Sequence, residues 1–164
     1  MGSTAVDSSN HKDIRIVVRK KQRKLELFAG EKLVRSYRVV LGFAPMGIKE
    51  TEGDGKTPEG EFYVYSKNPN SKYHLSLGIS YPSVADAKRA LGQNLITQEE
   101  HDSIGTAVEM KELPLQKTAL GGEIYIHGGG IAEDWTGGCI AVSNEDMTEI
   151  FDAISLGAKI TILA

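Results

Sequence analysis

One cysteine lies close to a histidine and a pair of glycines in the stretch from Ile124 to Val142. Cys139 is the only cysteine of the chain, so it cannot form an internal disulfide. Gly137 and Gly138 directly precede it and carry no side chains that would shield its sulfur. With His127 nearby in the sequence, this thiol is a candidate nucleophile.

The residues around this pair predict two short strands. The apolar run from Ile124 to Ile126 ends at His127, and a second run, Ile140 to Val142, follows Cys139. Strands that are separate in sequence can be neighbours in a sheet, so we expect the imidazole and the thiol to meet at two strand ends. A nearby cation lowers the pKa of a thiol, so the two groups can form a thiolate–imidazolium pair.

The glycines fit the same chemistry. The backbone N–H groups of Gly137, Gly138 and Cys139 can hold a developing oxyanion, so the predicted reaction class is acyl transfer. Each feature also has a structural interpretation. A lone cysteine is often a small buried hydrophobe, the run from Gly128 to Gly130 can be a flexible turn, and Trp135 can serve packing.

The composition indicates a single globular domain. The 164 residues are 40% hydrophobic and 25% charged, close to globular averages, and no apolar run approaches the ~20 residues of a membrane span. The net charge of -3 gives no reason to expect nucleic acid as a partner. Residues 1–13 are polar and without a signal-like apolar segment, so we interpret them as a disordered tail or a remnant of expression, an export leader having been removed. Residues 14–164 are the predicted catalytic domain.

The first third of the chain predicts three antiparallel strands. Alternating apolar residues begin at Ile14 and resume at Leu25, and the range 32–41 continues the pattern. We interpret the basic run from Lys20 to Lys24 as a solvated hairpin turn that protects a strand edge. We expect Asp134, far along the chain, to be solvated or to cap its local turn.

The remaining sequence predicts one long loop, further strands and two capped helices. Residues 42–60 hold glycines and prolines typical of a functional loop, and a strand over 62–66 follows it. Thr97 predicts the start of a helix at about residue 98, and Ser143 predicts a helix that Gly157 ends. Residues 159–163 alternate as a closing strand. The predicted fold is mainly β with a few helices.

Three motifs resemble one known family. The histidine-glycine pair at His127 and the order from Thr136 to Cys139 resemble the signature of the L,D-transpeptidase catalytic domain family, also called YkuD-like. Residues 53–62 are similar to its Lys-Thr-Pro-x-Gly-x-Phe segment. Residues 72–82 and 134–136 resemble a branch of small bacterial envelope members with a Trp-Thr-x-Gly-Cys-Ile-Ala motif. The resemblance covers nearly the whole chain.

The resemblance implies a fold, a site and a reaction. The family fold is an antiparallel β-sandwich or barrel-like domain, with Cys139 as nucleophile and His127 as general base and acid, oriented by a main-chain carbonyl. Members attack a peptidoglycan stem peptide and hold it as a thioester. An amine then gives a 3→3 cross-link or attachment to an envelope protein, and water gives a trimmed stem. The resemblance implies an exported protein of the periplasm or cell wall, no cofactor or metal, and carbapenem-type inhibitors.

Two departures from the family pattern leave alternatives open. Gly137 stands where many members have histidine, and Ala141 stands where many have arginine. An L,D-carboxypeptidase or amidase that hydrolyses stem-peptide or stem–protein bonds is one alternative, and a non-catalytic cell-wall-binding module is another. Backbone groups of Gly128, Gly137 and Gly138 are further candidates for the groove, as are the side chains of His74, Trp135 and Thr136.

The other histidines carry no predicted role. His11 belongs to the polar tail and His101 to the predicted helix near residue 98. Four scattered histidines and one cysteine give no zinc-binding pattern, so the sequence predicts no metal site.

Overall fold

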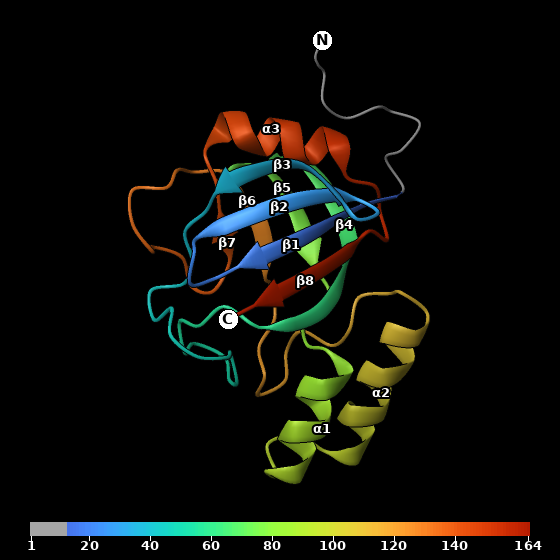
Figure 1. Ribbon diagram of the computed structural model, residues 1–164. Coiled ribbons are helices and arrows are strands. Elements are labelled where there is room, and N and C mark those ends of the chain that lie inside the picture. Colours follow the sequence, from blue (N-terminus) through green and yellow to red (C-terminus); the bar gives the residue numbers. More distant parts are fainter. Residues whose placement is uncertain (1–12) are drawn as a thin grey trace.

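The computed structural model describes residues 13–164, and within them eight strands form one sheet in the order β3-β2-β1-β8-β4-β5-β6-β7 (Figure 1). The strands are β1 (Ile14–Arg19), β2 (Lys24–Ala29), β3 (Lys32–Arg38), β4 (Gly60–Ser71), β5 (His74–Ile79), β6 (Tyr125–His127), β7 (Ile140–Ala141) and β8 (Lys159–Leu163). The helices are α1 (Val84–Gly92), α2 (Gln98–Glu109) and α3 (Asn144–Ala153). The expectation of a mainly β fold with a few helices is confirmed.

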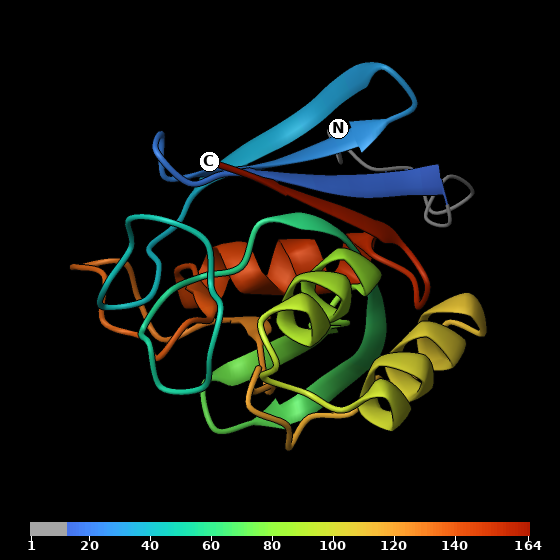
Figure 2. The same cartoon turned by 90° about the horizontal axis from the view of Figure 1, so that it is seen from below.

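The sheet is curled, and one helix fills its concave side. The strands β1, β2, β3 and β8 lie on one side of α3, and β4 and β5 lie on the other (Figures 1 and 2). Most neighbouring strands are antiparallel, as expected, but β8 runs parallel to β1 and β7 runs parallel to β6. The closing strand therefore joins the first strand to the middle of the sheet. Helices α1 and α2 pack together and project from its lower edge in Figure 1.

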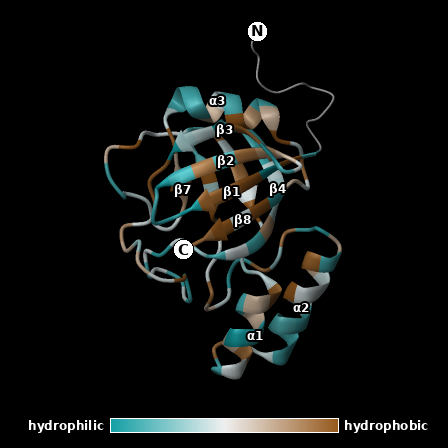
Figure 3. Cartoon of the chain, in the orientation of Figure 1, coloured by the Kyte–Doolittle hydropathy of each residue, from teal (hydrophilic) through white to brown (hydrophobic). Residues whose placement is uncertain are grey.

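Apolar alternation explains the inner strands. Ile14, Ile16 and Val18 of β1 are at most 2% exposed, and Ile160 and Ile162 of β8 are buried beside them. Figure 3 shows apolar residues gathered on these central strands. One set of alternating side chains thus enters the core, as period-two patterning requires. The predicted meander of β1, β2 and β3 is confirmed by their antiparallel pairing.

Local capping explains where the helices begin. Thr97 accepts a hydrogen bond from the N–H of Glu100, whose carboxylate accepts from the Thr97 N–H, so the predicted start of α2 is confirmed. Ser143 caps α3 in the same position, as predicted. The predicted end of α3 at Gly157 is wrong, because the helix stops at Ala153 and Gly157 lies in the following turn at φ 87°. Helix α1 was not predicted.

The basic hairpin turn is not solvated as predicted. The Lys20 side chain is only 4% exposed, and its Nζ donates to the carbonyl oxygens of Gly47 and Thr57 at 2.8 and 2.6 Å. It also donates to Glu59 at 3.1 Å. The long loop that follows β3 is therefore attached to the first hairpin through one buried ammonium group. Lys21 and Gln22 are exposed, so the prediction of a solvated turn holds for these two residues.

Asp134 is another residue whose environment was predicted wrongly. Its carboxylate accepts hydrogen bonds from Arg23 at 3.1 and 2.6 Å and from the backbone N–H of Leu41 at 2.8 Å. These donors hold the pKa of Asp134 below its ordinary value. The carboxylate thus fixes the loop before Cys139 to the end of the first hairpin.

The predicted tail over residues 1–13, including His11, lies outside the described residues except for residue 13. Among residues 13–164, no helix combines the length and apolar composition needed to cross a bilayer.

We predict that Lys20→Met destabilises the protein by about 2–4 kcal/mol, because a methionine leaves the buried Thr57 carbonyl oxygen without its donor and also loses the bonds to Gly47 and Glu59. Urea unfolding followed by fluorescence measures the change. Lys21→Met is the matched control, since its side chain is exposed, and we expect it to stay within about 0.5 kcal/mol. Equal midpoints for the two variants would contradict the role of Lys20.

Candidate active site

The predicted pair of strand ends is formed by β6 and β7. These strands are parallel, with Ile126 opposite Ile140 and His127 opposite Ala141. Cys139 directly precedes β7 and therefore lies beside the start of β6. His127 is the last residue of β6. The N–H of Val142 donates to the His127 carbonyl at 2.9 Å and continues the pairing.

His127 is held in one orientation and one tautomer. Its side chain is buried, and Nδ1 lies 2.5 Å from the carbonyl oxygen of Gly128. A carbonyl oxygen can only accept, so Nδ1 carries the proton and Nε2 presents a lone pair. Burial lowers the pKa of His127, and the Gly128 carbonyl opposes this effect. The imidazole is therefore neutral at neutral pH and suited to act as a base.

Two aromatic rings enclose the imidazole. Tyr73 stacks on His127 with ring centroids 4.6 Å apart and an interplanar angle of 24°. Trp135 meets His127 edge-on at 5.6 Å, and its indole N–H donates to the Gly130 carbonyl at 3.1 Å. A β-carbon on Gly129 would lie 2.9 Å from the Trp135 ring, so glycine allows the close approach. The rings account for much of the burial that keeps the imidazole neutral.

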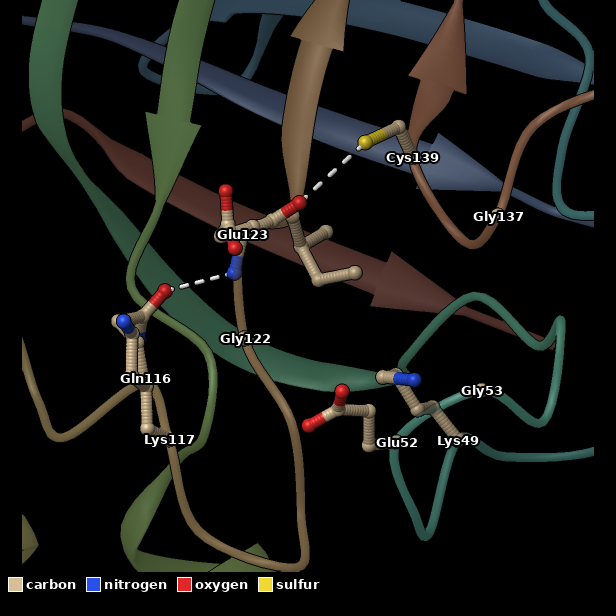
Figure 4. Close-up of a pocket in the computed structure, with 10 residues that line it drawn as sticks. Lys49, Glu52, Gly53, Gln116, Lys117, Gly122, Glu123, Gly137 and Cys139 are labelled. Atoms are coloured by element: carbon tan, nitrogen blue, oxygen red, sulfur yellow. Dashed lines mark hydrogen bonds between the residues drawn. The ribbon is translucent and has the colours of Figure 1, made fainter.

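Cys139 is half-buried and is held by main-chain groups. Its sulfur accepts from the Tyr125 N–H at 3.3 Å, and the thiol donates to the Glu123 carbonyl at 3.5 Å (Figure 4). Burial raises the pKa of the Cys139 thiol to about 11. The described structure therefore combines a neutral thiol with a neutral imidazole, whereas the sequence suggested a thiolate–imidazolium pair.

The backbone donors near the cysteine differ from the expected set. The Gly138 N–H donates to Thr136 Oγ1 at 3.1 Å, and that hydroxyl donates to the Cys139 carbonyl at 2.7 Å. Gly138 also needs its missing side chain, because a β-carbon there would lie 2.9 Å from the Lys56 carbonyl oxygen. In this structure the Gly138 N–H is thus already engaged within its own loop, and its role as an oxyanion donor stays a prediction. The Gly137 and Cys139 N–H groups are the remaining candidates.

Two cavities meet at the cysteine. The larger, of about 680 Å³, is lined by both His127 and Cys139, together with Tyr65, Ser66, Asn68, Ser71, Lys72, Tyr73, Ser76, Glu123 and Tyr125. We call it the histidine cavity. The other, of about 440 Å³, is lined by Lys49, Glu52, Gly53, Gln116, Lys117, Gly122, Glu123, Ile124, Gly137 and Cys139 (Figure 4). We call it the paired-charge cavity. Cys139 and Glu123 line both, so the two cavities adjoin at these residues.

The structure does not bring every candidate residue to these cavities. His74 is exposed, and its Nε2 lies 2.9 Å from the Thr148 hydroxyl of α3, so the structural interpretation of this histidine is favoured over a groove role. Trp135 lines a separate hollow with Tyr73. Gly128 acts through its carbonyl on His127. His101 lies on α2 and contacts Asp102.

Sequence reasoning missed three residues that line the cavities. Tyr73 stands in a segment that resembles the family. The sequence analysis named the adjacent His74 as the groove residue, whereas Tyr73 lines the cavity. Glu123 has the left-handed φ of 57°, which nothing in the sequence indicates. Lys49 lies in the predicted functional loop over residues 42–60, where no spacing pattern distinguishes it from the other charged residues. Among the described residues, no group of three or more His, Cys, Asp or Glu side chains is arranged to hold a metal ion.

Comparison with protein families gives one match over almost the entire chain. The model of the YkuD family, described as the L,D-transpeptidase catalytic domain, matches residues 13–162. A relative in Escherichia coli K12, named "Putative L,D-transpeptidase YafK", is 28% identical over 147 residues. The match covers 85% of this chain and 46% of the relative, so the chain spans about half the length of that protein.

Solved structures show the same fold. The helical cell shape determining protein Pgp2 from Campylobacter jejuni matches with a TM-score of 0.62 and 21% identity, over 91% of this chain and 46% of that one. Bd1075 from Bdellovibrio bacteriovorus matches with a TM-score of 0.60 and 22% identity, over 96% and 50% of the two chains. LdtMt1, an L,D-transpeptidase solved in complex with imipenem, matches with a TM-score of 0.53 and 14% identity, over 92% and 59%.

We predict that Cys139 reacts slowly with iodoacetamide at neutral pH and faster as the pH rises toward about 11. Only the thiolate attacks, and a pKa raised from 9.0 to about 11 lowers its fraction about 100-fold. Alkylation quenched at successive times and analysed by intact mass spectrometry, from pH 6 to pH 11, measures the dependence of the rate on pH. A rate that is already at its plateau by pH 7 would instead indicate a resting thiolate–imidazolium pair.

Proposed function

This chain belongs to the L,D-transpeptidase catalytic domain family, and we propose that it catalyses cysteine-dependent acyl transfer on peptidoglycan stem peptides. In this proposal Cys139 is the nucleophile and His127 is the general base and acid. Residues 14–164 form the catalytic domain. The family relation and the shared fold support the reaction class, and the geometry of the two side chains supports their roles.

One observation carries the proposal. Cys139 and His127 line the same cavity from paired strand ends, and the Gly128 carbonyl orients the imidazole so that Nε2 has a free lone pair. A nucleophile, a base and a group that orients the base are the parts that activated thiols require. The carbonyl takes the orienting role that an acidic side chain has in many other enzymes.

Acylation follows from the neutral state of both groups. His127 Nε2 takes the thiol proton as Cys139 Sγ bonds to the carbonyl carbon of the stem peptide. The oxygen develops negative charge, and in this proposal the N–H groups of Gly137 and Cys139 stabilise it. The C–N bond then breaks, the imidazolium gives its proton to the leaving amine, and the stem remains as a thioester on the sulfur.

The second half of the reaction uses the same base. An amine enters the histidine cavity, loses a proton to His127 Nε2 and attacks the thioester, which forms a new amide and restores the thiol. This produces a 3→3 cross-link or the attachment of an envelope protein. Water in place of the amine gives L,D-carboxypeptidase or amidase activity. The completely buried Ala141, at the position where many family members have arginine, favours this hydrolytic candidate.

The setting of the reaction is part of the proposal. Peptidoglycan lies outside the cytoplasmic membrane, so a stem-peptide enzyme acts as an exported protein of the periplasm or cell wall. Carbapenem-type compounds are expected to acylate the same sulfur, since a β-lactam carbonyl presents the same kind of electrophile. The solved structure of LdtMt1 with imipenem is consistent with this expectation.

We predict that incubation with a tetrapeptide stem or imipenem gives a covalent adduct whose mass equals the acyl group, and that Cys139→Ala abolishes it. His127→Ala lowers the acylation rate by about 100-fold to 10,000-fold, because general base catalysis is lost. His101→Ala, on α2 and outside the linings of both cavities, is the control and retains the wild-type rate. Intact mass spectrometry measures all three. An undiminished adduct in Cys139→Ala refutes the proposal, and stem binding without turnover by the wild type supports a wall-binding module.

We predict that the acylation rate falls in acid with an apparent pKa below 6.5, because burial lowers the pKa of His127 and only its neutral form accepts the thiol proton. Tyr73→Ala removes the stacked ring and admits water, so the acidic limb moves up toward 6.5. A pH–rate profile of each protein measures the shift. An unchanged limb in Tyr73→Ala would contradict the role of the stack in keeping His127 neutral.

We also predict the product distribution that separates the two candidate reactions. Muropeptides incubated with the protein and a competing amine yield cross-linked or amine-capped stems if transfer dominates. Trimmed stems dominate if water is the acceptor. The alanine at position 141, where many family members have arginine, favours this second outcome. Chromatography of the products with mass detection measures the ratio.

A further inference from the structure

The peptide group that joins Gly128 to Gly129 has a side-chain partner on each side. Its carbonyl oxygen accepts from His127 Nδ1 at 2.5 Å, and its N–H donates to Asn144 Oδ1 at 2.9 Å. We propose that Asn144 is a positioning residue, which acts through this peptide group to keep His127 in the orientation and tautomer of the base. The inference rests on the proposed function for the role of His127. Asn144 lines neither the histidine cavity nor the paired-charge cavity, so it acts without touching the substrate.

The glycine run does not hold this peptide group by itself. Glycine has little intrinsic preference among backbone conformations, and Gly129 and Gly130 adopt φ values of 110° and 108°. A rotation of the peptide plane between Gly128 and Gly129 would turn the carbonyl away from His127 Nδ1. The Asn144 amide oxygen opposes this rotation, since it accepts the N–H only while the plane keeps its present orientation.

The other contacts of the run hold the neighbouring peptide groups. The Gly128 N–H donates to the Tyr73 carbonyl at 3.0 Å, and the Gly130 N–H donates to the Val142 carbonyl at 3.1 Å. These bonds fix the two ends of the turn and leave the middle peptide group to Asn144. The packing there is close, because a β-carbon on Gly128 would overlap Asn144 Oδ1.

Asn144 is itself placed by a fixed element. It is the first residue of α3, and Ser143 caps this helix by accepting the Asp146 N–H at 3.1 Å. The Thr148 hydroxyl donates to the Asn144 carbonyl at 3.2 Å and lies 2.9 Å from His74 Nε2, which joins the first turn of α3 to β5. A residue on such an element holds a partner more precisely than a residue on a loop. Because Ser143 supplies the cap, the Asn144 side chain is not needed to start the helix.

The two hydrogen bonds strengthen one another through the peptide group. A peptide whose N–H donates has a more polarised carbonyl, which is therefore a better acceptor. Asn144 thus strengthens the bond from His127 Nδ1 to the Gly128 carbonyl. Burial lowers the pKa of His127, and the bond to Gly128 opposes this effect. Without the asparagine oxygen, the pKa of His127 falls further.

Charged and titratable side chains surround this chain of hydrogen bonds. They are Lys72 and Tyr73 in the turn before β5, His74 at the start of β5, Glu123 and Cys139 around the histidine cavity, and Glu145 and Asp146 in the first turn of α3. Burial and the Gly128 carbonyl, rather than any of these charges, cause the pKa shift of His127. An uncharged substitution at position 144 therefore reaches the imidazole through the peptide group.

The first test reads the tautomer of His127 directly. In two-bond 1H–15N NMR spectra of histidine-labelled protein, we expect the wild type to show one tautomer, protonated at Nδ1, and Asn144→Ala to show a mixture of both tautomers. The His127→Ala spectrum identifies the resonances. An unchanged His127 spectrum in Asn144→Ala would overturn the proposal.

The second test is the rate of acylation by a tetrapeptide stem. Asn144→Ala is expected to lower the maximal rate about 3-fold to 10-fold, as the loss of one hydrogen bond implies, with an unchanged half-saturating concentration. The acidic limb of its pH–rate profile moves to lower pH, because the imidazolium has lost support. Glu145→Ala, at the next exposed position of α3, is the matched control and retains the wild-type rate and limb. An equal loss in Glu145→Ala, or a change confined to the half-saturating concentration, would overturn the assignment.

Asn144→Asp separates positioning from packing and keeps the test decisive should Asn144→Ala disturb the fold. A carboxylate oxygen still accepts the Gly129 N–H and suits the N-terminus of a helix, so we expect one tautomer and a rate close to that of the wild type. Its negative charge stabilises the imidazolium, so the acidic limb moves to higher pH, opposite to its direction in Asn144→Ala. A mixture of tautomers in Asn144→Asp would overturn the proposal. Absence of a thioester on wild-type Cys139 would refute the proposed function, while the NMR spectra would still decide the role of Asn144.

Discussion

The parallel pairing of β6 with β7 is the constraint on which the candidate site depends. It places His127 at the end of one strand and Cys139 just before the start of its neighbour, although the two residues are twelve positions apart in the sequence, with a glycine-rich loop between them. The Gly128 carbonyl then fixes the imidazole, and the Glu123 carbonyl and Tyr125 N–H fix the sulfur. Every one of these contacts comes from the main chain. The geometry therefore depends on the path of the backbone more than on neighbouring side chains, which explains why glycines are concentrated here.

Burial favours the uncharged form of both Cys139 and His127. It raises the pKa of Cys139 to about 11 and lowers the pKa of His127, so each change favours the neutral form. A neutral thiol reacts poorly with adventitious electrophiles, and it becomes a nucleophile only where a base and an oxyanion donor act together. Such a site links reactivity to a correctly bound substrate. The stack of Tyr73 and the edge of Trp135 contribute to this environment by excluding water from one side of the imidazole.

The features that the sequence predicted are those whose cause is local. Alternating residues predicted β1, β2 and β3, the Thr97 and Ser143 caps predicted two helix starts, and the apolar runs beginning at Ile124 and Ile140 predicted two neighbouring strands. Interactions between distant segments escaped prediction. Asp134 pairs with Arg23 from 111 residues away, and this pairing has no periodic or spacing signal, since it depends on how separate loops meet. A local contact was missed as well: the Thr136 hydroxyl, two residues earlier in the same loop, accepts the Gly138 N–H that the sequence analysis had assigned to the substrate.

The loop between β3 and β4 shows how such a distant interaction reaches the site. Lys20, in the first hairpin, holds the carbonyl oxygens of Gly47 and Thr57 at the two ends of the segment that contains Lys49. Thr57 in turn accepts the Gly42 N–H at 3.1 Å, and the neighbouring Lys56 carbonyl approaches Gly138 so closely that no side chain fits there. The wall of the paired-charge cavity is thus positioned by a buried ammonium that does not itself line it. Because a lysine is costly to bury without partners, the first hairpin and the loop stabilise one another, and the cavity gains its rigidity from that mutual requirement.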